Sequence, residues 1–368
     1  MPRLRAFLLN ALTVAASLLV TLLLFEGALR LMPVAWAPPV QPPTTDNPIQ
    51  RYAASTPFTW SVGWNFSTVV RGRTNAQGFV ADFDYDAAAR TPLIAVIGDS
   101  YVEALMVPFA ETITGRLQAA MGARGRAYTF AQSGSPLSQY IAYARHACTV
   151  YRPQRMAFVI VGNDFEESLY AHRARDGIHH LHPRADGFDL TLTPPVPPRL
   201  TERIARNSAL ALYLVRNVGI IWKLRDWGVA HAAPAPNAYV GNTAAAASPE
   251  RLAQGERVIA WFFGELARSC VAPADILLLV DPPRPQLYDP AALKDARASY
   301  FGRMRVLLIE RARAAGFAVA DLETHFGDSY AKDGRIFEVP GDGHWNAHAH
   351  GVAAEAVRAA FRDGMSRP

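Results

Sequence analysis

The stretch that decides the fold is Leu93-Ile94-Ala95-Val96-Ile97-Gly98-Asp99-Ser100, an apolar run that ends in a glycine and then presents a serine. A short β-branched run of this kind is typical of a strand that is buried on both faces of a parallel sheet. Similar runs recur at 127–131, 156–161, 276–280 and 317–322, with helical patterns at 137–150, 250–269, 293–315 and 347–362. Strands that alternate with helices predict a three-layer α/β/α domain with a parallel sheet and right-handed crossovers.

The regular alternation stops between residues 165 and 248, a stretch too long for a simple connection. It therefore predicts an insertion with structure of its own after the third strand. Within it, the segments 177–181 and 188–192 flank a Gly-containing turn and predict a β-hairpin. The apolar segment 208–224 predicts a helix, and the polar Arg216 and Asn217 inside it favour a lid packed on the domain over a second membrane span.

The N-terminus predicts a membrane anchor. Arg3 and Arg5 precede the uncharged, leucine-rich run 6–25, which is long enough to cross a bilayer core. The alternative is a cleaved signal peptide with small residues at 35–37, but the length of the run and the prolines directly after that site favour an uncleaved anchor. The two arginines then predict a single-pass protein of the inner membrane, with its domain in the periplasm or outside the cell.

These boundaries predict three regions: an anchor at 1–30, a Pro-rich linker at 31–60 and a domain at 61–368 that carries the insertion 165–248. Cys148 and Cys270 would then face an oxidising compartment. Each cysteine ends a helical pattern just before a predicted strand, which favours a disulfide between them over two separate buried thiols.

Composition and motifs exclude several classes of function. The 368 residues include 37 basic and 32 acidic ones, and the resulting charge of +5 is scattered, so nucleic acid is not an expected partner. Neither a P-loop nor a G-x-G-x-x-G fingerprint occurs, and no cofactor is expected. His179, His180 and His182 invite a metal site, but alternate residues of a strand point to opposite faces and no further ligand completes the set. We expect a solvated hairpin there and no metal.

Residues suited to acyl chemistry follow the first three predicted strands. Ser100 follows the first strand, Gly134 the second and Asn163 the third, and His344 lies in a late Asp342-Gly343-His344 segment. The carboxyl ends of parallel strands meet at one edge of the sheet, where such folds bind ligands. A serine activated by an imidazole, beside N–H donors from Ser100, Gly134 and Asn163, is a nucleophile with an oxyanion hole.

Four blocks in this order resemble the signature of the SGNH or GDSL hydrolase superfamily: Gly98-Asp99-Ser100, Gly134, Gly162-Asn163-Asp164 and Asp342-Gly343-His344. The resemblance covers the chain from about residue 93 to its end, apart from the insertion. It implies a flavodoxin-like α/β/α sandwich with Ser100 as nucleophile, His344 as general base, and Gly134 and Asn163 in the oxyanion hole. The segment 342–346 also resembles the late motif of SGNH-like proteins tied to cell-surface polysaccharide O-acetylation.

One departure concerns the acid of the triad. Many members of the superfamily have an Asp three residues before the His, whereas Asp342 lies two before His344. Asp342 is the first choice as the group that orients the imidazole, and Asp281 and Asp321, at other predicted strand ends, are the alternatives.

The function expected from the residues and the resemblance is a serine esterase that acts on O-acyl, above all O-acetyl, esters of a carbohydrate. Two alternatives stay open. The same acyl-enzyme could pass its acyl group to an exopolysaccharide or cell-wall glycan, which would make the protein an O-acetyltransferase. The fold could also serve as a carbohydrate-binding or assembly subunit without turnover.

Overall fold

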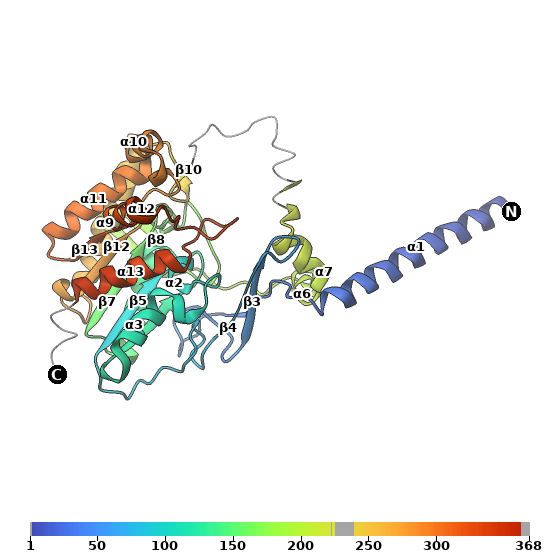
Figure 1. The fold of residues 1–368 in the computed structure, drawn as a ribbon, viewed down its shortest axis with the longest axis horizontal. Coiled ribbons are helices and arrows are strands. Elements are labelled where there is room, and N and C mark those ends of the chain that lie inside the picture. The colour runs from blue at the N-terminus through green and yellow to red at the C-terminus, as the bar shows by residue number, and fades with distance from the viewer. Residues whose placement is uncertain (1, 222, 225–238, 362–368) are drawn as a thin grey trace. The chain divides into compact units, whose positions relative to one another are not determined.

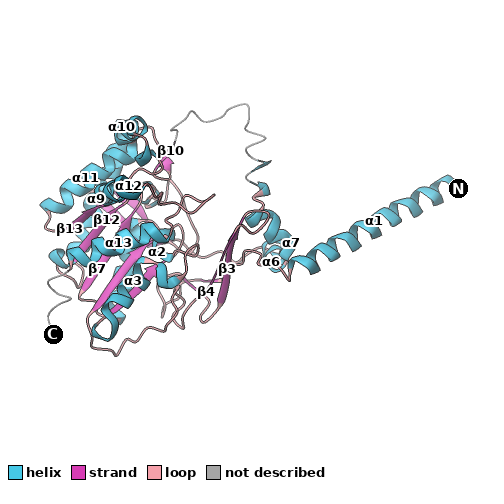
Figure 2. Cartoon of the chain, viewed as in Figure 1, coloured by secondary structure: helices cyan, strands magenta, loops and turns pink. Residues whose placement is uncertain are grey.

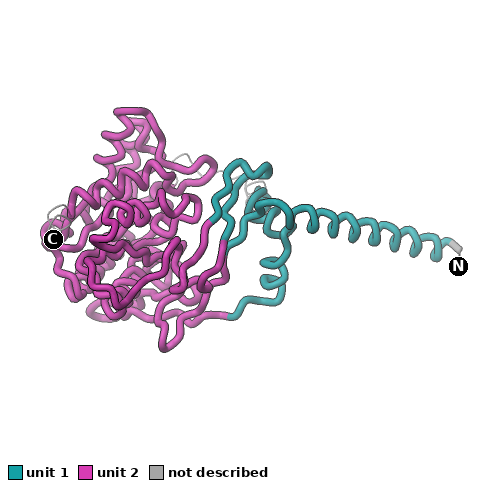
Figure 3. The backbone as a smooth tube through the Cα atoms, turned by 60° about the horizontal axis from the view of Figure 1, so that its bottom comes forward, with its two compact units in different colours: residues 1–37, 58–71, 197–233 teal, residues 38–57, 72–196, 234–368 magenta. Residues whose placement is uncertain are grey.

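The computed structural model describes residues 2–221, 223–224 and 239–361. The chain forms two compact units (Figure 3). Unit 1 comprises residues 1–37, 58–71 and 197–233, and unit 2 comprises 38–57, 72–196 and 234–368. The predicted insertion 165–248 is therefore divided, because its middle part groups with the N-terminal residues.

The centre of unit 2 is a five-stranded parallel sheet (Figure 2). Its strands are β5 (Leu93–Gly98), β6 (Arg126–Ala131), β7 (Arg155–Ile160), β12 (Ile276–Val280) and β13 (Ala318–Asp321). Their order across the sheet is β6-β5-β7-β12-β13, and every neighbouring pair is parallel. This is the flavodoxin-like order, in which the direction of winding reverses between β5 and β7. The predicted strands and fold class are confirmed.

Helices cover both faces of this sheet (Figure 1). One face packs against α4 (Leu137–Val150), α9 (Pro249–Ala267) and α11 (Tyr300–Ala314). The other packs against α3 (Ile113–Met121), α12 (Leu322–Asp333) and α13 (Ala347–Ala360). Alternate strand residues enter the two cores: Ile97 lies in the first and Val96 in the second.

The remaining elements of unit 2 are short. They are β1 (Val40–Gln41), β2 (Arg51–Tyr52), α2 (Ser100–Glu103), α5 (Asp164–Glu167), β8 (His179–Arg184), β9 (Gly187–Leu192), β10 (Tyr239–Val240), β11 (Thr243–Ala244) and α10 (Pro290–Ala298). The predicted hairpin is confirmed as the antiparallel pair β8–β9. The single helix predicted over 293–315 is wrong: Ser299 is extended and its Oγ accepts from Gly302 N–H, so a new helix starts there.

A disulfide joins Cys148, near the end of α4, to Cys270, which lies between α9 and β12. These are the two cysteines that the sequence predicts to pair. The two cysteines are 122 residues apart in the chain, so the bond ties the second half of the sheet to the first.

Unit 1 contains α1 (Pro2–Leu29) and most of the hairpin formed by β3 (Pro57–Val62) and β4 (Thr68–Arg73). It also contains α6 (Leu200–Asn207) and α7 (Ala209–Leu212), followed by a π-helical turn at Tyr213–Asn217. Among the described residues, α1 is the one helix long and apolar enough to cross a membrane, with a mean hydropathy of 2.3 over its best window. Such a helix at the N-terminus fits an anchor or a signal sequence.

Ser208 and Asn217, which lie in the segment predicted as a lid, form hydrogen bonds with other residues of unit 1. The Glu26 carboxylate of α1 accepts from Ser208 Oγ at 2.8 Å and from the first N–H groups of α7 at 2.9 and 3.0 Å. Asn217 is buried, and its Nδ2 donates to Ser61 Oγ on β3 at 2.7 Å. Asn217, one of the two polar residues that argued against a second span, therefore has a structural partner.

Candidate active site

Ser100 is the first residue of α2 and follows β5 directly, at the carboxyl edge of the sheet and beside the reversal of strand order. Gly98 permits this sharp turn, because a Cβ there would meet Val102 Cγ2 at 2.5 Å. Asp99 caps the helix by accepting from Tyr101 N–H at 2.9 Å. The serine is buried, with 8% of its surface exposed, so the fold holds its hydroxyl in a defined place.

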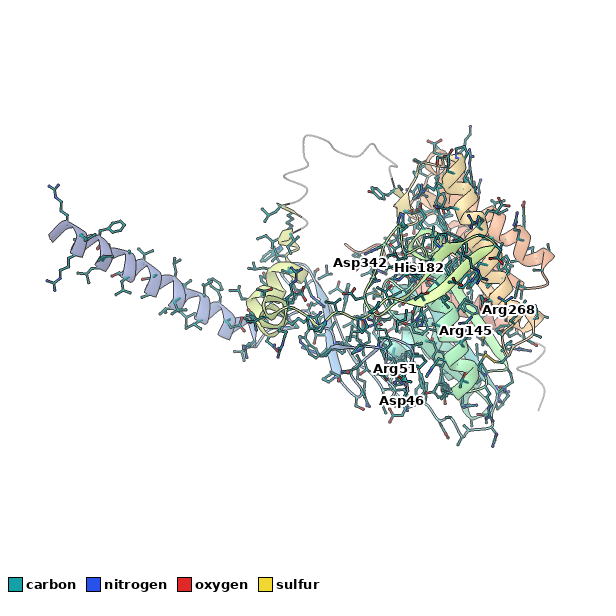
Figure 4. The ribbon with its side chains drawn as sticks, turned by 180° about the vertical axis from the view of Figure 1, so that it is seen from behind. Asp46, Arg51, Arg145, His182, Arg268 and Asp342 are labelled. Atoms are coloured by element: carbon teal, nitrogen blue, oxygen red, sulfur yellow. A yellow bond between two sulfur atoms is a disulfide. The ribbon has the colours of Figure 1, made fainter. Side chains whose placement is uncertain are left out.

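The structure brings Ser100, His344 and Asp342 together. Ser100 Oγ lies 2.8 Å from His344 Nε2, and His344 Nδ1 pairs with Asp342 Oδ1 on its other side. The same Asp342 oxygen accepts from the backbone N–H of His344 at 2.9 Å. Figure 4 labels Asp342 in the loop that precedes α13. The spacing of two residues therefore lets one carboxylate hold both the ring and the backbone of the histidine.

The alternative acids have other partners. Asp281 accepts from Trp345 Nε1 at 2.8 Å and forms a buried ion pair with Arg284 at 2.8 Å. Asp321 caps α12 and pairs with Arg305. Neither is hydrogen-bonded to the imidazole in the part of the chain that the structure describes. Asp342 is the acid that the geometry supports.

The electrostatics of the triad favour a base that ionises readily. Burial alone would lower the pKa of His344, but the hydrogen bond and charge of Asp342, with Asp99 nearby, outweigh burial and raise it above its usual value. The pKa of Asp342 is lowered because its bond with the histidine overcomes the effect of its own burial. An imidazolium formed during proton transfer is thus stabilised where it forms.

Arg284 holds the loop that carries the histidine, and sequence reasoning missed it. Its Nη1 donates to the carbonyl oxygen of Gly343 at 3.2 Å and contacts Glu338 at 3.1 Å, while Asp281 binds the rest of the guanidinium. Tyr101 OH donates to the same carbonyl at 3.2 Å. The sequence does contain a signal for this contact. Asp281 directly follows a buried strand, and Arg284, a residue of opposite charge, lies three positions after it.

Three backbone or amide donors at this edge make no hydrogen bond within the described part of the chain. Ser100 N–H, at the start of α2, has no intrahelical acceptor. Among the described residues, no hydrogen bond uses Gly134 N–H or Asn163 Nδ2, and Asn163 Oδ1 is buried without a partner. Free donors at the ends of β5, β6 and β7 are what a developing oxyanion requires.

The loop that carries Gly134 is held from two sides. The Glu103 carboxylate accepts from Ser133 N–H at 3.2 Å and from Ser133 Oγ, and Arg175 Nη1 donates to Gly134 O. Gly134 has φ +72°, and a Cβ there would meet Arg175 Nη1 at 1.7 Å. A side chain at this left-handed position would be strained and would displace the Arg175 guanidinium, so glycine is the residue that fits it best.

Two buried acids, Asp99 after β5 and Asp164 after β7, bind the backbone where these strands end. Burial raises the pKa of Asp99 to about 6, and burial followed by the charge of Asp99 raises that of Asp164 well above its usual value. Asp164 Oδ2 accepts from Tyr140 OH at 3.1 Å and from Val161 N–H at 2.9 Å. Both acids thus accept backbone N–H groups, and the bond from Val161 N–H to Asp164 holds the turn that presents Asn163.

The β10–β11 hairpin lies against the same turn. A Cβ on Gly162 would meet the carbonyl oxygen of Gly241 at 2.1 Å, so the two backbones are in direct contact. Asn242 Nδ2 donates to Tyr101 OH at 3.1 Å, and Thr243 Oγ1 donates to Glu166 at 2.8 Å. This hairpin was not predicted, and its contacts place it beside the residues that follow Ser100 and Asn163.

The histidine cluster of the β8–β9 hairpin is held by polar neighbours. His179 Nδ1 pairs with Gln139 Oε1 and His180 Nδ1 with Thr193 Oγ1, each at 2.9 Å. The expectation of a solvated hairpin is wrong for His180, which is fully buried. Within the described residues no group of three His, Cys, Asp or Glu side chains is arranged to hold a metal.

No family model and no curated protein sequence matches the chain. Among solved structures, it is similar to a member of the lipolytic G-D-S-L family from Veillonella parvula, with 9% identity, a TM-score of 0.40, and 74% of this chain and 99% of that one covered. It is similar to a variant of an acetyl xylan esterase from Geobacillus stearothermophilus, with 12% identity, a TM-score of 0.38, and 77% and 99% covered. It is also similar to a lipase/acylhydrolase from Enterococcus faecalis, with 12% identity, a TM-score of 0.36, and 74% and 96% covered.

Proposed function

We propose that the chain is a membrane-anchored, extracytoplasmic serine esterase that removes O-acyl groups, above all acetyl groups, from a carbohydrate. The observation that carries the proposal is the continuous chain of contacts from Ser100 Oγ through His344 to Asp342. Beside it lie the N–H groups of Ser100 and Gly134, which donate to no other backbone group in the part of the chain that the structure describes. A nucleophile, a base with its orienting acid, and an oxyanion hole are the parts that ester cleavage needs.

In the proposed reaction, His344 Nε2 takes the Ser100 proton as Oγ forms a bond to the ester carbonyl carbon. The N–H groups of Ser100 and Gly134 and the Asn163 amide hold the oxyanion. When the ester C–O bond breaks, the alcohol leaves with the proton from His344. Water then gives a proton to His344, attacks the acyl carbon and releases the carboxylic acid, with the proton returned to Ser100 Oγ.

The substrate class is supported by the resemblance of the four sequence blocks to the SGNH superfamily and of segment 342–346 to proteins tied to polysaccharide O-acetylation. The location is supported by two features. Arg3 and Arg5, at the N-terminal end of α1, favour an N-terminus in the cytoplasm. The disulfide between Cys148 and Cys270 is of a kind that persists in oxidising compartments.

Ser100→Ala in the purified full chain tests the mechanism. We expect hydrolysis of p-nitrophenyl acetate and labelling by a fluorophosphonate probe both to be lost, because no other hydroxyl contacts His344 Nε2 among the described residues. Ser329→Ala, on the surface helix α12, is the control and should retain both. Full activity of the Ser100 variant would refute the mechanism.

Acetylated oligosaccharides test the substrate. We expect free acetate as the product, in an amount equal to the acetyl groups lost. If an added, unacetylated oligosaccharide became acetylated faster than acetate appeared, acyl transfer would replace hydrolysis as the function.

A further inference from the structure

Within unit 1, α6 and α7 lie beside the C-terminal end of α1 (Figure 1). An open groove of about 710 Å³ is lined by residues of these three helices. Its apolar lining comes from Leu22 and Leu23 of α1, Leu200 and Ile204 of α6, and Leu210 of α7. Leu200 and Ile204 are four residues apart and therefore share one face of α6. They are 69% and 61% exposed, and Leu23 is 61% exposed. Such a surface is unfavourable in water and favourable against hydrocarbon.

Two cations line the same groove. Arg30 is bound to Glu26 at 2.8 Å and donates to the carbonyl of Asn207 at 3.2 Å, so its guanidinium is held in place. The Arg203 side chain is exposed and has no hydrogen bond or ion pair with any other described residue. One ordered and one unpaired guanidinium beside an apolar lining match the chemistry of a phosphate attached to acyl chains.

The position of the groove along α1 fits the surface of a bilayer. The uncharged run 6–25 spans about 30 Å as a helix, which is the thickness of the hydrocarbon core. Glu26, the first charged residue after it, caps α7 and so fixes α6 and α7 at this level. Leu22 and Leu23 then lie about one turn inside the hydrocarbon boundary, and Arg30 about one turn outside it.

We propose that this groove binds one anionic glycerophospholipid of the membrane, with its acyl chain along the leucines and its phosphate at Arg203 and Arg30. The inference rests on the anchoring proposed above and is independent of the esterase chemistry. The bound lipid would fix the orientation of α6 at the interface and keep its apolar face out of water.

The test is a lipid titration of the purified full chain in detergent, followed by native mass spectrometry. The probes are dioleoyl phosphatidylglycerol, which is anionic, and dioleoyl phosphatidylcholine, which is zwitterionic. We expect one phosphatidylglycerol per chain and weaker binding of phosphatidylcholine. Arg203→Ser should weaken phosphatidylglycerol binding about tenfold, the effect of about 1.4 kcal/mol from one charge-assisted contact.

Arg206→Ser is the matched control, because it removes the same charge from the same helix at a position outside the groove. It should bind phosphatidylglycerol as the unchanged chain does. Equal effects of the two variants would overturn the inference, because attraction to lipid would then be a general effect of charge. The double variant Leu200→Ser/Ile204→Ser should weaken binding of both lipids, and unchanged binding would also overturn it.

Flotation of the full chain with phosphatidylcholine vesicles tests the anchor separately. A chain that floats but binds the two lipids equally in the titration refutes the groove and leaves the anchor. Esterase activity on p-nitrophenyl acetate should be equal in Arg203→Ser and in the unchanged chain, which also shows that the variant has folded. A chain that neither floats nor binds lipid refutes both proposals.

Discussion

Replacement of Asp342 by Asn is the most informative perturbation of the site. The substitution keeps the size of the side chain but removes the charge that faces His344 Nδ1. Opposite charges about 4 Å apart interact by about 4 kcal/mol at an effective dielectric constant of 20. Because the side chains of His344 and Asp342 are 30% and 22% exposed, solvent reduces this energy, and we take about 3 kcal/mol.

That energy is gained when the imidazolium forms, so it is lost from the transition state and kcat should fall about 150-fold. The assay is hydrolysis of p-nitrophenyl acetate across pH. His344 must be neutral to act as a base, so activity falls as the pH drops through its pKa. Asp342 raises that pKa, and its replacement should move the acid limb of kcat/KM to lower pH.

Asp328→Asn, which alters an exposed acid on α12, is the control and should change neither kcat nor the acid limb. Wild-type kcat in Asp342→Asn, with the acid limb unmoved, would refute the role assigned to Asp342. A fall in kcat with an unmoved limb would assign Asp342 a purely structural role in the loop.

Three further variants probe other parts of the site and fold. Asn163→Ala should lower kcat by about 10²- to 10³-fold with little change in KM, because one oxyanion donor is lost; an unchanged kcat in steady-state assays would remove Asn163 from the oxyanion hole. Arg284→Ala leaves Asp281 buried without its partner and should lower the free energy of unfolding by about 3–5 kcal/mol in urea titrations, a result that a loss below 1 kcal/mol would contradict. The double variant Cys148→Ser/Cys270→Ser opens a loop of 122 residues and should lose up to about 5 kcal/mol of stability by the chain-entropy estimate while keeping kcat; a large fall in kcat at a temperature where the protein is folded would show that the bond shapes the site.

The features that could be predicted from the sequence are those that depend on residues close together in the chain. Buried parallel strands are short apolar runs, so all five core strands were found, and the residue after each strand could be placed at the ligand-binding edge. Ser100, Gly134 and Asn163 follow from that rule. The cysteine pair followed from the position of each thiol at a helix end before a strand.

Other features depend on contacts between distant side chains, which a local pattern does not contain. The support of the Gly343 carbonyl by Arg284 and Tyr101 joins segments more than 50 residues apart. The capping of α7 by Glu26 joins residues 182 positions apart. The helix α3 was not predicted, and Ser299 could have been recognised as the start of a new helix from its capping chemistry.

The double hold of Asp342 on His344 has a consequence for how the site can change. Because one carboxylate binds both the ring and the backbone of the histidine within a three-residue segment, any displacement of the loop 339–346 carries acid and base as one body. The distance from Ser100 Oγ to His344 Nε2 is then the one separation in the triad that such a displacement alters. Substitutions can therefore shift this loop and change how the site fits an ester, while His344 stays bound to Asp342, the group that orients it.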